Sequence, residues 1–124
     1  MFRRCYSLST APSVLPATTL AEGCYNNMFI YCTSLLSAPS LPATILAPSC
    51  YYNMFRECTN LVTAPKVLPA TTLADWCYYS MFYNCSNLSS APSLSATTLA
   101  DWCYAWMFYG CRKLSACPQI PYIT

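Results

Sequence analysis

Cysteine is the residue type with the greatest capacity for chemistry in this 124-residue chain, which contains ten of them. Thiolates bind metals, and pairs of thiols oxidise to disulfides. Nine of the ten recur at two positions of an internal repeat. The first series is Cys24, Cys50, Cys77 and Cys103, and the second is Cys5, Cys32, Cys58, Cys85 and Cys111. Only Cys117 departs from both series, which leaves it open to a bond between subunits.

Three interpretations of these cysteines follow. The first is a reduced, buried series of core residues, because a free thiol behaves as a small apolar group and nine of ten obey the repeat. The second is disulfides between neighbouring units, such as Cys24–Cys50 or Cys77–Cys103. The third is a metal or iron–sulfur site, which the absence of His and of close C-x-x-C pairs disfavours. The first interpretation is preferred, so no metal and no cofactor is expected.

Catalysis finds little support in the composition. Histidine, the commonest general base, is absent, and the four acidic residues are scattered along the chain. With only Gly23 and Gly110 as glycines, a glycine-rich phosphate loop cannot form. The sequence therefore predicts a protein that is not an enzyme.

The charge distribution also excludes some partners. Only 8% of residues are charged while 56% are hydrophobic, and the net charge is +2 with no run of basic residues. Nucleic-acid binding is therefore not expected. Proline, serine and threonine interrupt every apolar stretch well short of the roughly 20 residues that span a bilayer, so no membrane span is predicted.

An internal repeat organises the whole chain. Met-Phe dipeptides begin at residues 1, 28, 54, 81 and 107, which gives spacings of 27, 26, 27 and 26 residues. Periods of this size are typical of stacked repeat proteins. We predict one domain over residues 1–124 with about four and a half units, approximately 1–23, 24–49, 50–76, 77–102 and 103–124.

Each unit is predicted to combine a short helix with a short strand. Cys77, Met81 and Cys85 are spaced i, i+4, i+8 in the stretch 73–85, which indicates one helical face. The stretch 88–94 contains Ala-Pro and should be extended. The predicted fold is an α/β solenoid with a short-stranded parallel sheet, similar to leucine-rich repeats. The two cysteine series without Cys5, together with the methionines Met28, Met54, Met81 and Met107, should form its core.

The element C-Y-x-x-M-F-x-x-C-x-x-L, as in residues 77–88, resembles a repeated element of the BspA-like leucine-rich-repeat surface proteins. The resemblance covers essentially the whole chain. It implies a leucine-rich-repeat solenoid, a location at the cell surface or outside the cell, and a role in adhesion or protein binding. The chain differs from that family in its cysteines, its Pro-Ala-Thr-Thr connections and its short length.

Aromatic residues on the outer face of the predicted helices are candidates for an interaction surface, because clustered exposed aromatic side chains mark binding patches. The alternative is that they pack on each other. The set is Trp76, Tyr79, Tyr83, Trp102, Trp106 and Tyr109.

Neither end of the chain is distinctly polar, whereas repeat stacks normally carry polar caps. An uncapped stack can add a copy head to tail, and a contact that does not close makes a filament. The candidate end contacts are Met1, Phe2, Cys5, Cys117 and Tyr122.

The leading functional hypothesis is a non-enzymatic structural or interaction protein that associates end to end with copies of itself into a surface or extracellular filament. The alternative is a fragment of a cell-surface adhesin that binds a host protein or glycan through its aromatic face. A third hypothesis is a thiol-based metal or redox module.

Overall fold

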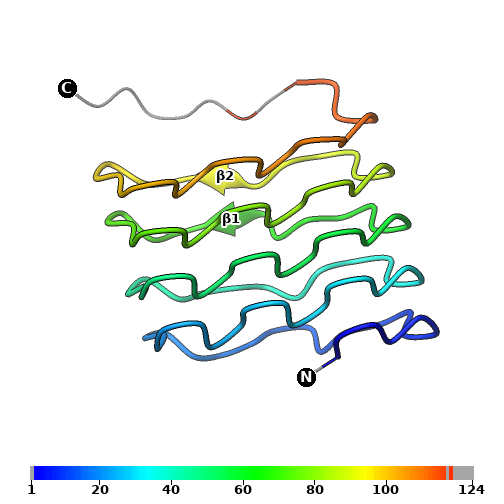
Figure 1. Ribbon diagram of the computed structural model, residues 1–124, viewed down its shortest axis with the longest axis horizontal. Coiled ribbons are helices and arrows are strands. Elements are labelled where there is room, and N and C mark those ends of the chain that lie inside the picture. Colours follow the sequence, from blue (N-terminus) through cyan, green and yellow to red (C-terminus); the bar gives the residue numbers. More distant parts are fainter. Residues whose placement is uncertain (1, 117, 119–124) are drawn as a thin grey trace.

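Successive repeats of the chain form successive coils that stack in one direction, with residue 2 in the first coil and the last described residues at the opposite end (Figure 1). The computed structural model describes residues 2–116 and residue 118. Equivalent residues of neighbouring coils lie side by side, as the stacked rings of Phe29 and Phe55 illustrate. We call each set of equivalent residues a column.

One half of each coil is a run of consecutive turns. We call these runs the turn segments, and they cover residues 22–31, 48–57, 75–84 and 101–110. Within them the backbone N–H groups alternate between two kinds of acceptor. The N–H of Tyr52 donates to the carbonyl of Ser49 three residues back, whereas the N–H of Asn53 donates to Tyr79 in the next coil. Half of the hydrogen bonds of a turn segment therefore close within the coil and half hold two coils together.

Every fourth residue of a turn segment has a left-handed backbone. In the segment 48–57 these residues are Ser49, Asn53 and Glu57, with φ between 55° and 63°. A left-handed residue ends any α-helix and costs an ordinary residue about 1–2 kcal/mol. The inter-coil hydrogen bonds and the packing of the columns must offset that cost at each position.

The other half of each coil is extended and pairs in parallel with its neighbours. Strand β1 (Val67–Leu68) pairs with strand β2 (Ser93–Leu94) in the register Val67↔Ser93 and Leu68↔Leu94. Single bridges continue the pattern elsewhere, for example from Ser37 through Thr63 to Ser90. Prolines in this half keep the pairing short, because proline has no N–H to donate.

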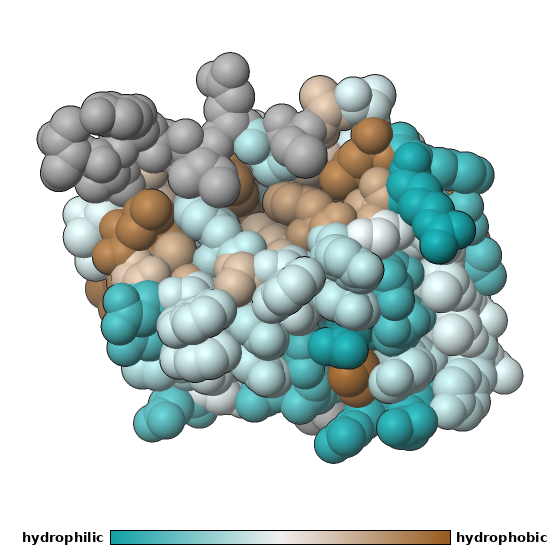
Figure 2. Space-filling view, turned by 45° about the horizontal axis from the view of Figure 1, so that its top comes forward, coloured by the Kyte–Doolittle hydropathy of each residue, from teal (hydrophilic) through white to brown (hydrophobic). Residues whose placement is uncertain are grey.

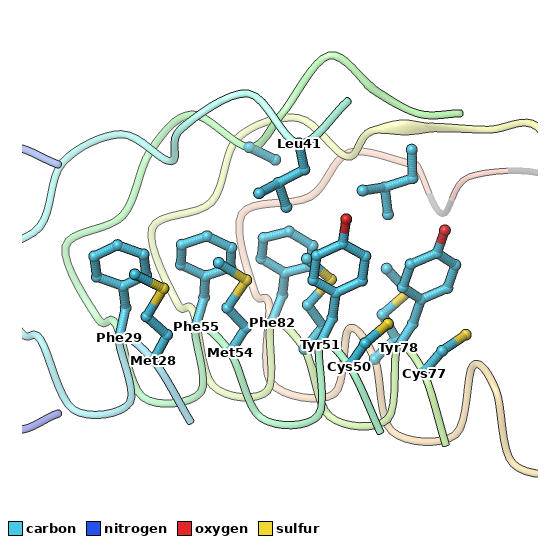
Figure 3. Packing of buried hydrophobic residues seen from close by; sticks show 14 of the residues in the cluster. Met28, Phe29, Leu41, Cys50, Tyr51, Met54, Phe55, Cys77, Tyr78 and Phe82 are labelled. Atoms are coloured by element: carbon cyan, nitrogen blue, oxygen red, sulfur yellow. The ribbon is translucent and has the colours of Figure 1, made fainter. Parts of the chain in front are cut away.

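The core lies between the two halves and consists of columns of identical side chains (Figure 3). Each turn segment contributes two inward residues and then two outward residues. Tyr51 is buried, the next two residues are partly exposed, and Met54 and Phe55 are buried again. The extended half contributes buried leucines such as Leu41 and Leu68 of β1, and Figure 3 shows Leu41 across from the aromatic rings.

The predicted helix over residues 73–85 is wrong. No helix occurs among residues 2–116, and the residues that were expected to be helical form a turn segment. The spacing of Cys77, Met81 and Cys85 has a different cause. The turn segment also repeats every four residues, and this repeat directs all three side chains inward. A period of four is close enough to the 3.6 of a helix to be confused with it over eight residues.

The wider prediction of an α/β solenoid of strand–helix units, similar to leucine-rich repeats, is wrong for the same reason. The strands of the described residues are two pairs of residues, β1 and β2, and the wall opposite them is made of turns rather than helices. The fold that the BspA-like resemblance implies is thus not the fold of this chain.

A membrane-crossing helix, likewise, is not found in the part of the chain that the structure describes.

The two glycines provide a matched test of the turn segments. Both are left-handed, with φ of 62° at Gly23 and 77° at Gly110. A Cβ atom at position 110 would lie 2.0 Å from Oδ1 of Asn84, whereas at position 23 its nearest neighbours are 3.9 Å away. The Asn84 amide also donates to Glu57 at 2.9 Å, and the clash would disturb that bond.

We therefore expect Gly110→Ala to lower the free energy of unfolding by about 2–3 kcal/mol, from backbone strain plus a lost hydrogen bond. Gly23→Ala should lower it by about 1–2 kcal/mol, from strain alone. Urea denaturation of both variants measures the difference. Equal losses would show that the contact between positions 84 and 110 does not exist.

Candidate functional site

The structure places most of the predicted core residues inside. The buried ones are Cys32, Cys50, Cys58, Cys77, Cys85, Cys103, Met28, Met54, Met81 and Met107. Cys24 is exposed and Cys111 is half-buried, because each belongs to a coil at one end of the described stack. Cysteine is therefore used here mainly as a core residue.

The second cysteine column has a hydrogen-bonding role that the sequence analysis missed. Four of its five thiols, all but Cys5, donate to the carbonyl of the phenylalanine one coil earlier, with sulfur–oxygen distances between 2.9 and 3.1 Å. The pairs are Cys32–Phe2, Cys58–Phe29, Cys85–Phe55 and Cys111–Phe82. A small apolar side chain with one weak donor suits a buried site that contains a carbonyl. Cysteine follows phenylalanine by three residues in every unit, and this recurrence is the sequence feature that could have indicated the role.

Burial suppresses ionisation of these thiols. Loss of hydration raises the pKa of Cys50 to about 11 and that of Cys77 to about 12, and it also raises the pKa of Cys58 and Cys85 well above the ordinary value. Because the thiolate is the nucleophile and the metal ligand, these groups are poorly suited to either role. Residues 2–116 also contain no group of three or more Cys, Asp or Glu side chains that could hold a metal ion.

Disulfides between coils, the second interpretation of the cysteines, do not occur among the described residues. Cys24, Cys50, Cys77 and Cys103 all carry free thiols, and so does Cys5. Cys117 lies outside the described residues.

The outward positions of the turn segments carry the predicted aromatic residues. Trp102, Trp106 and Tyr109 are each more than half exposed, and Trp76 is 37% exposed. Tyr79 and Tyr83 are partly exposed. We call these six residues, together with Tyr52, the aromatic surface.

The rings of the aromatic surface also pack on each other, as the alternative interpretation expected, and their role in binding stays a prediction. Trp76 stacks on Trp102 at 5.5 Å between ring centroids, Tyr52 on Tyr79 at 4.9 Å, and Tyr83 on Tyr109 at 5.0 Å. Stacked rings hold each other in place, so the surface is fixed before any partner arrives.

A pocket of about 310 Å³ opens within the aromatic surface and is lined by Arg56, Tyr79, Ser80, Tyr83 and Trp106. The Arg56 guanidinium lies over the ring of Tyr83, 4.1 Å from its centroid. Sequence reasoning missed Arg56, since it considered basic residues only as a possible run. Its position in the repeat, one coil before Tyr83, was the available signal.

The candidate end contacts are placed in part. Phe2 begins the phenylalanine column and stacks on Phe29 at 5.3 Å. Cys5 is exposed in the first coil. Met1, Cys117 and Tyr122 lie outside the described residues.

Thiol accessibility should follow this arrangement. In native protein treated with iodoacetamide, we expect rapid alkylation of Cys5 and Cys24, and protection of Cys58 and Cys85 until denaturant is added, because the latter are buried with raised pKa values. Peptide mass spectrometry measures each rate. Alkylation of Cys85 as fast as Cys24 would contradict the buried column.

Stability should fall at high pH. An unfolded thiol loses its proton near its ordinary pKa of 9.0, whereas Cys50 and Cys77 hold theirs to about 11 and 12. The folded state is thus favoured below pH 9, and this advantage is lost as pH rises from about 9 to about 12. Each buried thiol adds at most about 1.4 kcal/mol per pH unit to that slope. Denaturation at a series of pH values should show Cys77→Ala with the shallower slope, and an unchanged slope would contradict it.

Comparison with known proteins yields no relative. No family model matches the chain, and no curated protein and no solved structure is similar to it. The resemblance to BspA-like surface proteins therefore stays a prediction that depends on the repeated motif alone.

Proposed function

We propose that this chain is a non-enzymatic structural protein that associates end to end with copies of itself, at the cell surface or outside the cell. The observation that carries the proposal is that the two ends of the described stack expose complementary backbone groups and unfinished columns.

At the C-terminal end of the described stack, the last turn segment has a row of N–H groups without a backbone acceptor among the described residues. In earlier coils the corresponding N–H groups donate to the next coil, as Tyr78 does to Cys103 and Phe82 to Met107. Within the described residues, the N–H groups at the same positions of the last turn segment donate to no backbone carbonyl. They belong to Trp102, Tyr104, Trp106, Phe108 and Gly110. The Tyr104 hydroxyl is buried and also has no hydrogen-bond partner among the described residues. Such a row is a template for another chain.

At the N-terminal end, the same scheme leaves acceptors unused. Phe2 and Arg4 donate to the carbonyls of Met28 and Ile30. The carbonyls of Glu22, Cys24 and Asn26 accept no backbone N–H from the described residues. Donors at one end and acceptors at the other give the stack a polarity that suits head-to-tail contact.

The columns give that contact a register. If Phe108 of one copy stacks on Phe2 of the next, the phenylalanine column continues, as it does from Phe82 to Phe108 at 5.7 Å. Because equivalent residues make the same bonds in every coil, the Gly110 N–H of the first copy would then donate to the Arg3 carbonyl of the next copy. The Cys5 thiol of that next copy would donate to the Phe108 carbonyl of the first.

Apolar side chains are visible at the C-terminal end of the stack, beside the atoms drawn in grey (Figure 2). Burying them against a second copy would contribute about 25 cal/mol for each Å² of apolar surface. The low charged fraction of 8% removes the repulsion that would oppose such contact.

The adhesin alternative has one specific observation in its favour, which is the pocket in the aromatic surface on the side of the stack. A thiol-based metal or redox function has no such support, since the described thiols of the core are buried and held protonated.

End-to-end association can be tested with one charge at each end. We expect the wild type to form extended particles by light scattering and negative-stain microscopy, with reductant present throughout. Phe108→Lys and Phe2→Lys should each abolish them, because a buried, unpaired ammonium at the joint is strongly unfavourable. Mixing the two variants should give a dimer, since each keeps one intact end of opposite kind.

Val62→Lys is the matched control, because Val62 is exposed on the side of the stack and the change adds the same charge there. It should assemble as the wild type does. A monomeric wild type, or assembly of either end variant alone, would overturn the proposal. Circular dichroism of each variant shows whether the coils remain folded.

A further inference from the structure

The pocket in the aromatic surface exists because one outward column changes size abruptly. The column consists of Asn27, Asn53, Ser80 and Trp106, so a small residue in one coil lies below a tryptophan in the next. Trp106 and Ser80 both line the pocket, together with Tyr79 and Tyr83. The tryptophan is 52% exposed, and its ring contact in the described structure is an edge contact with Tyr109 at 5.4 Å. No described ring stacks on its face.

A cation without an acidic partner lines the same pocket. The Arg56 side chain is stacked over Tyr83, yet no described carboxylate forms an ion pair with it and no described acceptor takes a hydrogen bond from it. Its neighbour Glu57 instead accepts from the amide of Asn84. Stacking fixes the plane of the guanidinium and leaves its N–H donors available, which is the arrangement that binds a carboxylate with two parallel hydrogen bonds.

The pocket also contains a serine. Ser80 is only 1% exposed and lines the pocket, so the pocket is where its hydroxyl can meet a ligand. A hydroxyl can both donate and accept a hydrogen bond, so it can pair with a ring hydroxyl of a ligand.

The pocket does not suit a peptide that adds as a strand. The backbone N–H groups of Arg56, Tyr79 and Tyr83 all donate within their own coil, and that of Ser80 donates to Ala105. Strand addition needs a row of free backbone groups, and these four are occupied. A purely apolar ligand is also disfavoured, because it would strip water from the Arg56 charge without replacing it.

We propose that this pocket binds the carboxylate-bearing sugar ring of an acidic saccharide. The carboxylate pairs with the Arg56 guanidinium, the apolar face of the ring lies against Trp106, and a ring hydroxyl pairs with Ser80. The tyrosine rings close the sides, and their hydroxyls offer further hydrogen bonds. The site is on the side of the stack, so it is independent of the end contacts.

The test uses titration calorimetry with four probes: a galacturonic acid trisaccharide, sialyllactose, neutral lactose and an acidic Glu-Pro peptide. We expect one or both acidic saccharides to bind, and their comparison distinguishes a uronic acid from a sialic acid. Arg56→Gln should weaken binding about tenfold or more, because a charge-assisted hydrogen bond is lost. Trp106→Ala should also weaken it, and Arg56→Lys should retain only part of the affinity.

Two matched controls separate the pocket from its surroundings. Tyr6→Ala removes an exposed aromatic side chain that lies outside the aromatic surface, and Arg112→Gln removes an exposed charge elsewhere. Neither should change affinity. Phe2→Lys should bind as the wild type does even if it no longer assembles, which keeps this outcome separate from that of end-to-end association. Equal binding of lactose, tighter binding of the peptide, no binding of either acidic saccharide, or unchanged affinity in Arg56→Gln would overturn the proposal.

Discussion

The alternating hydrogen-bond scheme of the turn segments is the constraint on which the rest of the structure depends. In an α-helix every N–H in the interior is satisfied within its own segment. Here the N–H of Tyr51 depends on Cys77 of the next coil, and that of Asn53 depends on Tyr79. A single coil therefore cannot satisfy its own backbone, and its stability is shared with its neighbours. The same dependence leaves donors and acceptors unused at the two ends of the described stack.

Direct pairing of coils explains the unusual composition. Because equivalent residues lie side by side, each position must tolerate a copy of itself about 5–6 Å away, as the phenylalanine column does at 5.3–5.7 Å. Two like charges at that distance repel, whereas parallel aromatic rings, thiols and leucines attract. A charged fraction of 8% and an aromatic fraction of 15% follow from this requirement. Cysteine fits it particularly well, since it fills little space and satisfies a phenylalanine carbonyl.

The repeat spacing was enough to identify which residues are equivalent, so that Tyr51 could be matched with Tyr78 and Cys58 with Cys85. It was not enough to identify the local structure. A pattern of two inward and two outward residues fits four-residue turns and, over eight residues, fits a helix almost equally well. The left-handed positions could not be recognised from the sequence either. These positions are occupied by Trp76, Ser80 and Asn84, whereas a glycine would have indicated a positive φ. Only the inter-coil hydrogen bonds force these residues into that conformation, and those bonds are not local.

The candidate site, likewise, could be predicted from the sequence only in part. The aromatic residues could be named from the sequence, because they fall at outward positions of the motif, where Trp76 and Tyr83 recur as Trp102 and Tyr109. The pocket could not, because it results from the difference between two coils rather than from their similarity: Ser80 is small where Trp106 is large.

This difference suggests where function can vary in such a fold. Inward columns must repeat, since a change in one coil alters its packing against two others. Outward columns carry no such requirement, and they run from Asn26 and Asn27 in an early coil to Ala105 and Trp106 in a late one. The repeated interior thus supports a side surface whose residues are free to differ from coil to coil. An irregular feature on that surface, such as the change from Ser80 to Trp106 beside Arg56, is better evidence of a specific ligand than any of the repeated residues.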